Sequence, residues 1–133
     1  SGHVFFEDYC IKGLNDLKEK FETSDLKEKL TKLHNSKTEK LFYNWIEVWL
    51  SGRLKNWNVI PLIKNIKTPV FLIQGENDEY GTNKQVFDII NSVSTLGEYR
   101  ILKNTGHIPH LSNKEIVLEL SKQFIGKFIK LKI

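Results

Sequence analysis

The sequence has a single cysteine, Cys10, in 133 residues, and this scarcity excludes two kinds of site. Neither an intrachain disulfide nor a cysteine-based zinc site can form with one thiol. The neighbours Glu7 and Asp8 are acidic, which raises a thiol pKa rather than lowering it, so we predict a structural role for Cys10. Sparse cysteine is typical of a reducing compartment, and we expect a cytoplasmic location.

Long apolar runs are also missing. The run from Pro69 to Ile73 is among the longest and is far too short to span a bilayer. Lys12, Lys18 and Lys20 interrupt the early apolar residues, which argues against a secretory signal. We therefore expect no membrane partner.

Arginine is scarce, with only Arg53 and Arg100 among the 20 basic residues, although the net charge is +4. Contacts to base edges and phosphates favour arginine over lysine. The lysines alternate with acids in 16–20 and 25–29, which is typical of solvated helix faces. Only the tail, 126–133, is locally basic, so we expect no nucleic-acid partner.

Hydrophobic residues make up 40% of the chain and aromatic residues 11%, enough for one core. Residues 3–6 are apolar and predict the end of a buried strand. Helical periodicity extends from 12 to 34, with a break at Thr23-Ser24-Asp25, where Asp25 and Glu28 have capping-box spacing. A further helix is predicted over 38–50, followed by a connector over 53–67.

The pattern changes at Thr68, from helices to alternating strands and helices. Strands are predicted over 69–74 and 98–102, and helices over 83–93 and from Asn113, as N-cap, to about Lys130. This order is typical of an α/β fold with parallel strands. We divide the chain into 1–11, a helical cap over 12–67, and an α/β segment over 68–133.

Two loops follow the two strands, and each carries a candidate catalytic residue: Asp78 and His107. Loops at the carboxyl ends of parallel strands lie together, so these side chains are expected to meet. A carboxylate that holds one imidazole nitrogen leaves the other free to act as a general base. Glu76 and Glu79 are rival carboxylates in the first loop.

These segments resemble the α/β-hydrolase family. The run 68–78 looks like the family's strand and acid loop, and Gly106-His107 like its histidine loop. The family's G-x-x-D pattern implies that Asp78, rather than Glu76 or Glu79, is the acid. The acid precedes the histidine, as in these enzymes. The resemblance implies that 12–67 is a helical cap and that residues 3–8 continue from the nucleophile region. The expected fold is therefore the C-terminal part of an α/β-hydrolase sheet preceded by a cap.

One departure from the family decides the functional expectation, because no G-x-S-x-G motif is present. None of the serines lies in a glycine-flanked elbow: Ser1, Ser24, Ser36, Ser51, Ser92, Ser94, Ser112 and Ser121. The oxyanion donors of the family would also lie upstream. We expect the chain alone to be inactive, with Asp78 and His107 serving an upstream serine. The intact parent would hydrolyse ester, thioester, amide or related bonds of a small molecule, without a cofactor.

Aromatic residues are dense around Trp45 and Trp49, which share a helix face. They either pack between cap and sheet, the favoured interpretation for Trp45, or line an apolar substrate pocket. Tyr80, two residues after Asp78, either lines that pocket or packs under the acid loop.

Three alternatives compete with the hydrolase hypothesis. His107, His110 and Asp78 are two histidines and a carboxylate, the ligand set of one kind of iron site. Pro109 lies between the two histidines and nothing places them on one face, so we expect no metal. Two strands with open edges also fit a non-catalytic module that self-associates or binds the missing N-terminal half. A lysine-based nucleic-acid binder is the third, and it would bind in a strongly salt-dependent way.

Overall fold

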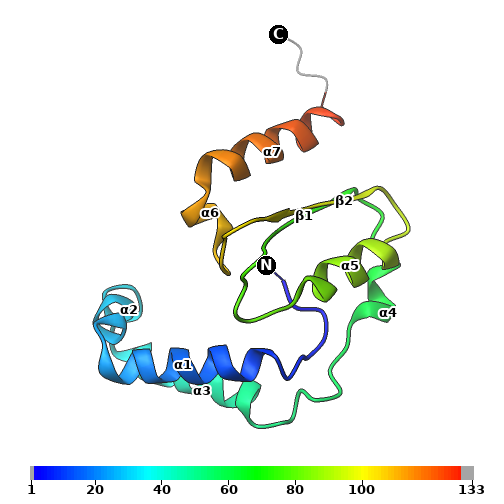
Figure 1. Cartoon of the computed structure of the whole chain (residues 1–133). Helices are drawn as coiled ribbons and strands as arrows, with labels where there is room; N and C mark the ends of the chain where they lie inside the picture. Colours follow the sequence, from blue (N-terminus) through cyan, green and yellow to red (C-terminus); the bar gives the residue numbers. More distant parts are fainter. Residues whose placement is uncertain (1, 130–133) are drawn as a thin grey trace.

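The protein is described by a computed structural model, which covers residues 2–129 (Figure 1). A helical region (residues 10–63) precedes an α/β region (residues 70–126). The helical region contains α1 (Cys10–Thr23), α2 (Leu26–His34), the short 3-10 helix η1 (Asn35–Lys37), α3 (Thr38–Leu50) and α4 (Ile60–Ile63). The α/β region contains β1 (Val70–Gly75), α5 (Asn83–Ser92), β2 (Gly97–Leu102), α6 (Pro109–Ser112) and α7 (Lys114–Gly126).

The strands of the described residues form a two-stranded parallel sheet, as the element order predicts. Val70 lies opposite Gly97 at one end, and Gly75 lies opposite Leu102 at the other. Helix α5 makes the crossover between the strands and packs on one face, while α7 lies on the other face (Figure 1). The carboxyl ends of both strands therefore open on the same side, and this brings the two predicted catalytic loops together.

The helical region has an aromatic core. The rings of Phe21 on α1 and Phe42 on α3 stack with centroids 3.7 Å apart, and Ile46 is fully buried beside them. The predicted break near Thr23 is confirmed, but the predicted capping box is wrong. The Asp25 side chain makes no capping bond, and Ser24 Oγ accepts from the Leu26 amide instead. The amide at the start of α2 is therefore satisfied by the Ser24 hydroxyl and not by the Asp25 carboxylate.

Residues 3–6 do not form the predicted strand. A single antiparallel bridge joins Phe5 to Asn58. The Gln85 side chain holds this segment instead, since its Oε1 accepts from the Val4 amide at 2.8 Å and its Nε2 donates to the Phe5 carbonyl at 3.0 Å. Two backbone groups that a strand would pair in a ladder are thus satisfied by one buried side chain.

The predicted cap of the last helix is also wrong. Asn113 precedes α7 but makes no capping bond, and its Nδ2 donates to Thr105 Oγ1 at 2.7 Å. The short helix α6, which begins at Pro109, was not predicted and fills part of the expected loop. Helix α7 ends at Gly126, earlier than predicted, and Lys130 lies outside the described residues.

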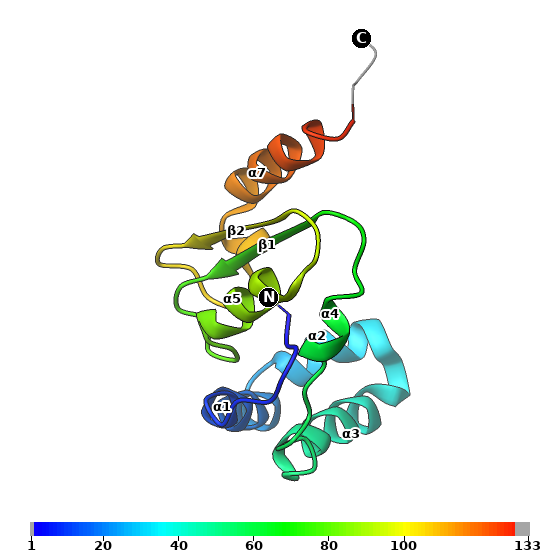
Figure 2. The same ribbon diagram turned by 90° about the vertical axis from the view of Figure 1, so that its right-hand side faces the viewer.

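Figure 2, turned by 90°, shows the sheet above α1 and α3. The start of the chain runs from below the sheet down to α1.

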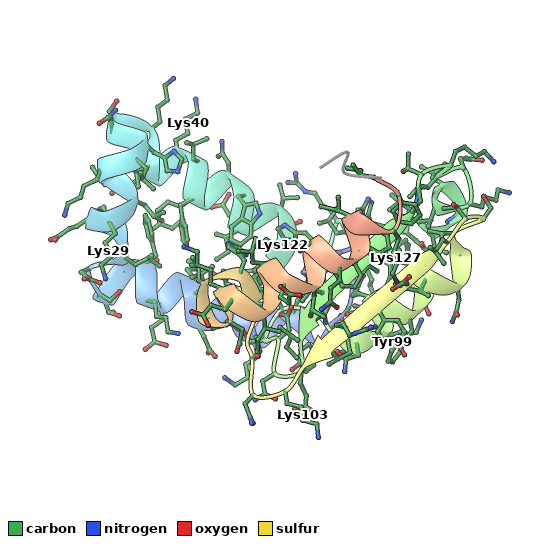
Figure 3. The ribbon with its side chains drawn as sticks, turned by 90° about the horizontal axis from the view of Figure 1, so that it is seen from above. Lys29, Lys40, Tyr99, Lys103, Lys122 and Lys127 are labelled. Atoms are coloured by element: carbon green, nitrogen blue, oxygen red, sulfur yellow. The ribbon has the colours of Figure 1, made fainter. Side chains whose placement is uncertain are left out.

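Across residues 2–129, no helix combines the length and the apolar character needed to cross a membrane. The lysines labelled in Figure 3 come from separate elements, with Lys29 on α2, Lys40 on α3 and Lys122 on α7.

Candidate active site

The two loops that follow the strands are joined through their backbones. The Glu76 amide donates to the Leu102 carbonyl and the Asn77 amide to the Thr105 carbonyl, both at 2.9 Å. Gly75 is the last residue of β1, directly before the first loop, and a Cβ on it would lie 2.2 Å from the carbonyl oxygen of Thr105. The glycine of the G-x-x-D pattern is therefore required for the close approach of the second loop, which carries His107.

Asp78 and His107 meet at this junction. The His107 Nδ1 lies 2.9 Å from Oδ1 and 3.0 Å from Oδ2 of Asp78, whose residue exposure is 2%. The Tyr80 amide donates to the same Oδ1 at 2.9 Å, and the Gly81 amide at 3.3 Å. Since the carboxylate accepts these bonds, we assign the proton to Nδ1 of His107, which leaves a lone pair on Nε2.

The rival carboxylates occupy other positions. Glu79 Oε2 accepts from the His107 backbone amide at 3.3 Å, so it supports the histidine loop rather than the ring. Glu76 is exposed. Of the three acids in this loop, Asp78 is the one whose oxygens lie within hydrogen-bond distance of the imidazole in the described structure. This geometry agrees with the preference for Asp78.

A cavity of about 350 Å³ opens beside the histidine, between the helical and α/β regions. Trp45, Trp49 and Tyr80 all line it together with His107. The remaining lining residues are His3, Cys10, Leu14, Leu17 and Ile108. The lining is mainly apolar and aromatic, with few polar groups, as in sites for small organic molecules.

Trp45 corrects one expectation, because it is 46% exposed and is not part of a buried core between cap and sheet. The buried face of α3 carries Thr38, Phe42 and Ile46, which recur at every fourth residue. Trp45 lies one position before Ile46, on the neighbouring face that borders the cavity.

The Tyr80 ring lies edge-on to the His107 ring, with centroids 4.7 Å apart. Burial raises the pKa of the Tyr80 phenol, and the carboxylates of Glu79 and Asp78 raise it further.

Helix α1 rests directly on the acid loop. A Cβ on Gly13 would lie 2.5 Å from the carbonyl oxygen of Glu79 and 3.2 Å from the Tyr80 ring. This glycine in the first turn of α1 therefore allows the helix backbone to approach the loop that carries Asp78. This contact joins the two regions at the site.

Sequence reasoning missed two residues: His3, which lies beside the dyad of Asp78 and His107, and Glu7, which holds the start of the chain. The His3 ring lines the cavity, with its centroid 5.3 Å from that of Trp49 and 6.3 Å from that of His107. Glu7 accepts from the Thr82 amide at 3.0 Å and from its hydroxyl at 2.6 Å, which ties the chain start to α5. No spacing in the sequence indicates either contact, since the partners lie far along the chain.

Cys10 lines the same cavity but is 2% exposed. Burial raises the pKa of its thiol, and the carboxylates of Glu7 and Asp8 raise it further against the opposing effect of a backbone hydrogen bond. The thiolate is the reactive form, so this environment disfavours a cysteine nucleophile.

Metal binding finds no support in residues 2–129, where no cluster of three or more His, Cys, Asp or Glu side chains could hold an ion. His110, the second histidine of the loop, is exposed. A larger surface hollow of about 700 Å³ lies between Lys18, Glu47 and Arg53, but neither Asp78 nor His107 lines it.

No protein-family model matches the sequence, and no curated protein sequence matches it either. The hydrogen-bonded dyad and the cavity beside it therefore carry what can be inferred about function.

Proposed function

We propose that this chain supplies the acid and the base of a serine-type α/β-hydrolase, with Asp78 as acid and His107 as base. The observation that carries the proposal is the contact of His107 Nδ1 with both oxygens of Asp78, at 2.9 and 3.0 Å. The carboxylate holds the ring in the tautomer whose Nε2 accepts a proton, which is the arrangement a general base needs. The reaction is acyl transfer from an ester, thioester, amide or related bond.

His107 carries the proton through both halves of the reaction. Its Nε2 removes the proton of the serine hydroxyl as the oxygen attacks the substrate carbonyl, and the same proton then goes to the leaving group. Water next gives its proton to Nε2 as it attacks the acyl-serine, and the regenerated serine oxygen takes that proton back. Asp78 orients the ring and stabilises the imidazolium that forms in each half.

The serine and the oxyanion donors belong to a segment upstream of this chain, in a sheet of which β1 and β2 are the last parallel strands. Two features support this arrangement: Asp78 precedes His107 in the chain, and each follows one of two neighbouring parallel strands. In this proposal the helical region is the cap, since the cavity lies between its α1 and α3 and the dyad. The chain alone is inactive.

The experiment compares p-nitrophenyl ester hydrolysis by this chain with hydrolysis by a protein in which the nucleophile-bearing segment precedes it. In the longer protein, His107→Ala should abolish turnover. Asp78→Asn should lower kcat about 10³–10⁴-fold, because the wrong tautomer is then stabilised. The matched control is Glu76→Gln, an exposed carboxylate of the same loop, which should change kcat less than twofold.

Three outcomes would overturn the proposal. Full activity of His107→Ala would show that His107 is not the base. A fall of less than tenfold in the kcat of Asp78→Asn would show that Asp78 is not the acid. Hydrolysis by the chain alone that disappears in Cys10→Ala would show instead that the cavity thiol is the nucleophile.

Association is a second candidate function, favoured by the edges of the sheet. Within residues 2–129 each strand pairs on one side only, and unpaired strand edges recruit further strands. Several large apolar side chains of α7 and of the residues just after it are also exposed: Ile116, Leu118, Ile125, Phe128 and Ile129. Sedimentation of the chain, alone and with the upstream segment, tests this function. A monomer in both cases with one sharp thermal transition would contradict it.

A further inference from the structure

His3 shares the cavity with His107, and its imidazole has no place in the mechanism above. The centroid of its ring lies 5.3 Å from that of Trp49 and 6.3 Å from that of His107. The next residues are held firmly, because the Val4 amide donates to Gln85 Oε1 and the Val4 carbonyl accepts from the Val59 amide at 2.7 Å. The imidazole is therefore fixed at the cavity wall by the backbone that follows it.

One edge of the His3 ring faces the backbone of Gly81. A Cβ built on Gly81 would lie 3.1 Å from Cε1 and 3.5 Å from Nδ1 of His3. Nδ1 is buried and has no hydrogen-bond partner among the described residues. A buried N–H without an acceptor is unfavourable, whereas a buried lone pair costs less, so the ring carries its proton on Nε2. The remaining polar group of the side chain is thus an N–H donor.

We propose that His3 is a substrate-binding residue whose Nε2–H donates a hydrogen bond to the carbonyl oxygen of an uncharged, largely apolar carbonyl compound in this cavity. The proposal deepens the proposed function, because it names the substrate class of the same site, and it rests on that function for the cavity being the substrate site. The donor and the base then act on one ligand from adjoining positions, since the two imidazoles lie side by side.

The chemistry of the wall favours an uncharged ligand. No lysine or arginine of the described residues lines the cavity, so the wall offers an anionic group no permanent positive charge. Trp45, Trp49 and Tyr80 offer faces and edges for an aromatic or branched aliphatic group. Burial lowers the pKa of His3, and nearby His107 lowers it further against the opposing effect of Asp78 and Glu7, so the ring stays neutral at pH 7.

The test uses two probes that no hydrolase cleaves: acetophenone, and α-methylstyrene, in which a CH₂ group replaces the carbonyl oxygen. Binding of each to the 133-residue chain is measured by NMR titration. His3→Phe should weaken acetophenone binding about fivefold, the value of one hydrogen bond, and change α-methylstyrene binding less than twofold. His3→Gln places an amide N–H near the Nε2 position and should restore acetophenone binding, whereas His3→Asn should not.

The wild-type chain supplies a measurement that needs no variant. A long-range ¹H–¹⁵N spectrum should show His3 as the Nε2–H tautomer only, at pH 7. Three results would overturn the proposal: an Nδ1–H tautomer, no acetophenone binding by the wild type, or equal losses of both probes in His3→Phe. Because neither probe is cleaved, a selective loss of acetophenone binding in His3→Phe would support the role of His3 even if the hydrolysis experiment fails. If the longer protein hydrolyses the ester but His3→Phe shows no selective loss of acetophenone binding, the role of His3 is rejected and the proposed function is kept.

Discussion

The helical and α/β regions bury different kinds of side chain. In the helical region the most deeply buried large residues are Phe21 and Ile46, at 1% and 0% exposure. In the α/β region the most deeply buried side chains include polar ones, which are Gln74, Asp78, Gln85 and Thr105. Apolar packing holds one region, and buried hydrogen bonds hold much of the other.

This difference matches what each region does. An apolar cluster is non-directional and only has to keep α1 and α3 together. A buried polar group needs a partner of defined geometry, so each one fixes a particular segment. Gln85 fixes residues 4–5, and Thr105 fixes the histidine loop through Asn113. The positions that build the site are therefore the polar ones.

The largest expected effect comes from Gly75→Ala, at the junction of the loops that carry Asp78 and His107. The new Cβ would lie 2.2 Å from two carbonyl oxygens of the histidine loop, so one loop must move. We expect a loss of about 4 kcal/mol or more in the free energy of unfolding, measured by urea denaturation. Gly126→Ala is the control, because nothing lies within 4 Å of its Cβ, and it should be neutral or stabilising by up to about 1 kcal/mol. Equal effects would refute the role of the close approach.

Phe21→Ala sharpens the comparison between apolar packing in the helical region and apolar packing in the α/β region. Its ring is 1% exposed and stacks on Phe42, so its removal should cost about 3 kcal/mol. Phe124→Ala in α7 removes a partly buried ring stacked on Phe71 at 5.0 Å and should cost about 1 kcal/mol. Hydrogen exchange should locate the first loss in α1 and α3. A larger effect at Phe124 would contradict the comparison.

Gly13→Ala tests whether the two regions act together. Alanine is the better helix former, which by itself would stabilise α1 by about 1 kcal/mol. The contact with the Glu79 carbonyl opposes this gain, so we expect a net loss of about 1–2 kcal/mol in the free energy of unfolding. The NMR signals of the His107 ring should move as well. A stabilised variant with unchanged signals would show that α1 does not bear on the acid loop.

The smallest effect concerns pH. The pKa of His3 is lowered below 6.5, chiefly by burial and then by His107, so the unfolded chain binds this proton more readily than the folded one. The contribution of neutral His3 to the free energy of unfolding is therefore fully present above about pH 6.5, and it is lost as the pH falls through the lowered pKa of the folded state. Urea denaturation at several pH values should show a shallower acid decline for His3→Phe than for the wild type. Identical declines would contradict the shift.

Local patterns predicted most of the elements. The bounds of α3 and the approximate positions of β1, β2 and α5 follow from periodicity and from flanking proline and glycine residues. The meeting of the two loops that carry Asp78 and His107 follows from their positions after neighbouring parallel strands. The caps assigned to Asp25 and Asn113 were wrong because a polar side chain can reach several partners, and tertiary contacts select among them.

The sequence by itself determined the order of helices and strands and the two loops that carry an acid and a histidine, because these depend on residues close together in the chain. Only the tertiary structure decided that Asp78 rather than Glu79 meets the imidazole, that Trp45 borders a cavity, and that His3 lies beside the dyad. Each of these outcomes depends on the packing of segments that are distant in sequence. Backbone contacts at Gly13 and Gly75, which allow no Cβ, bring those segments together.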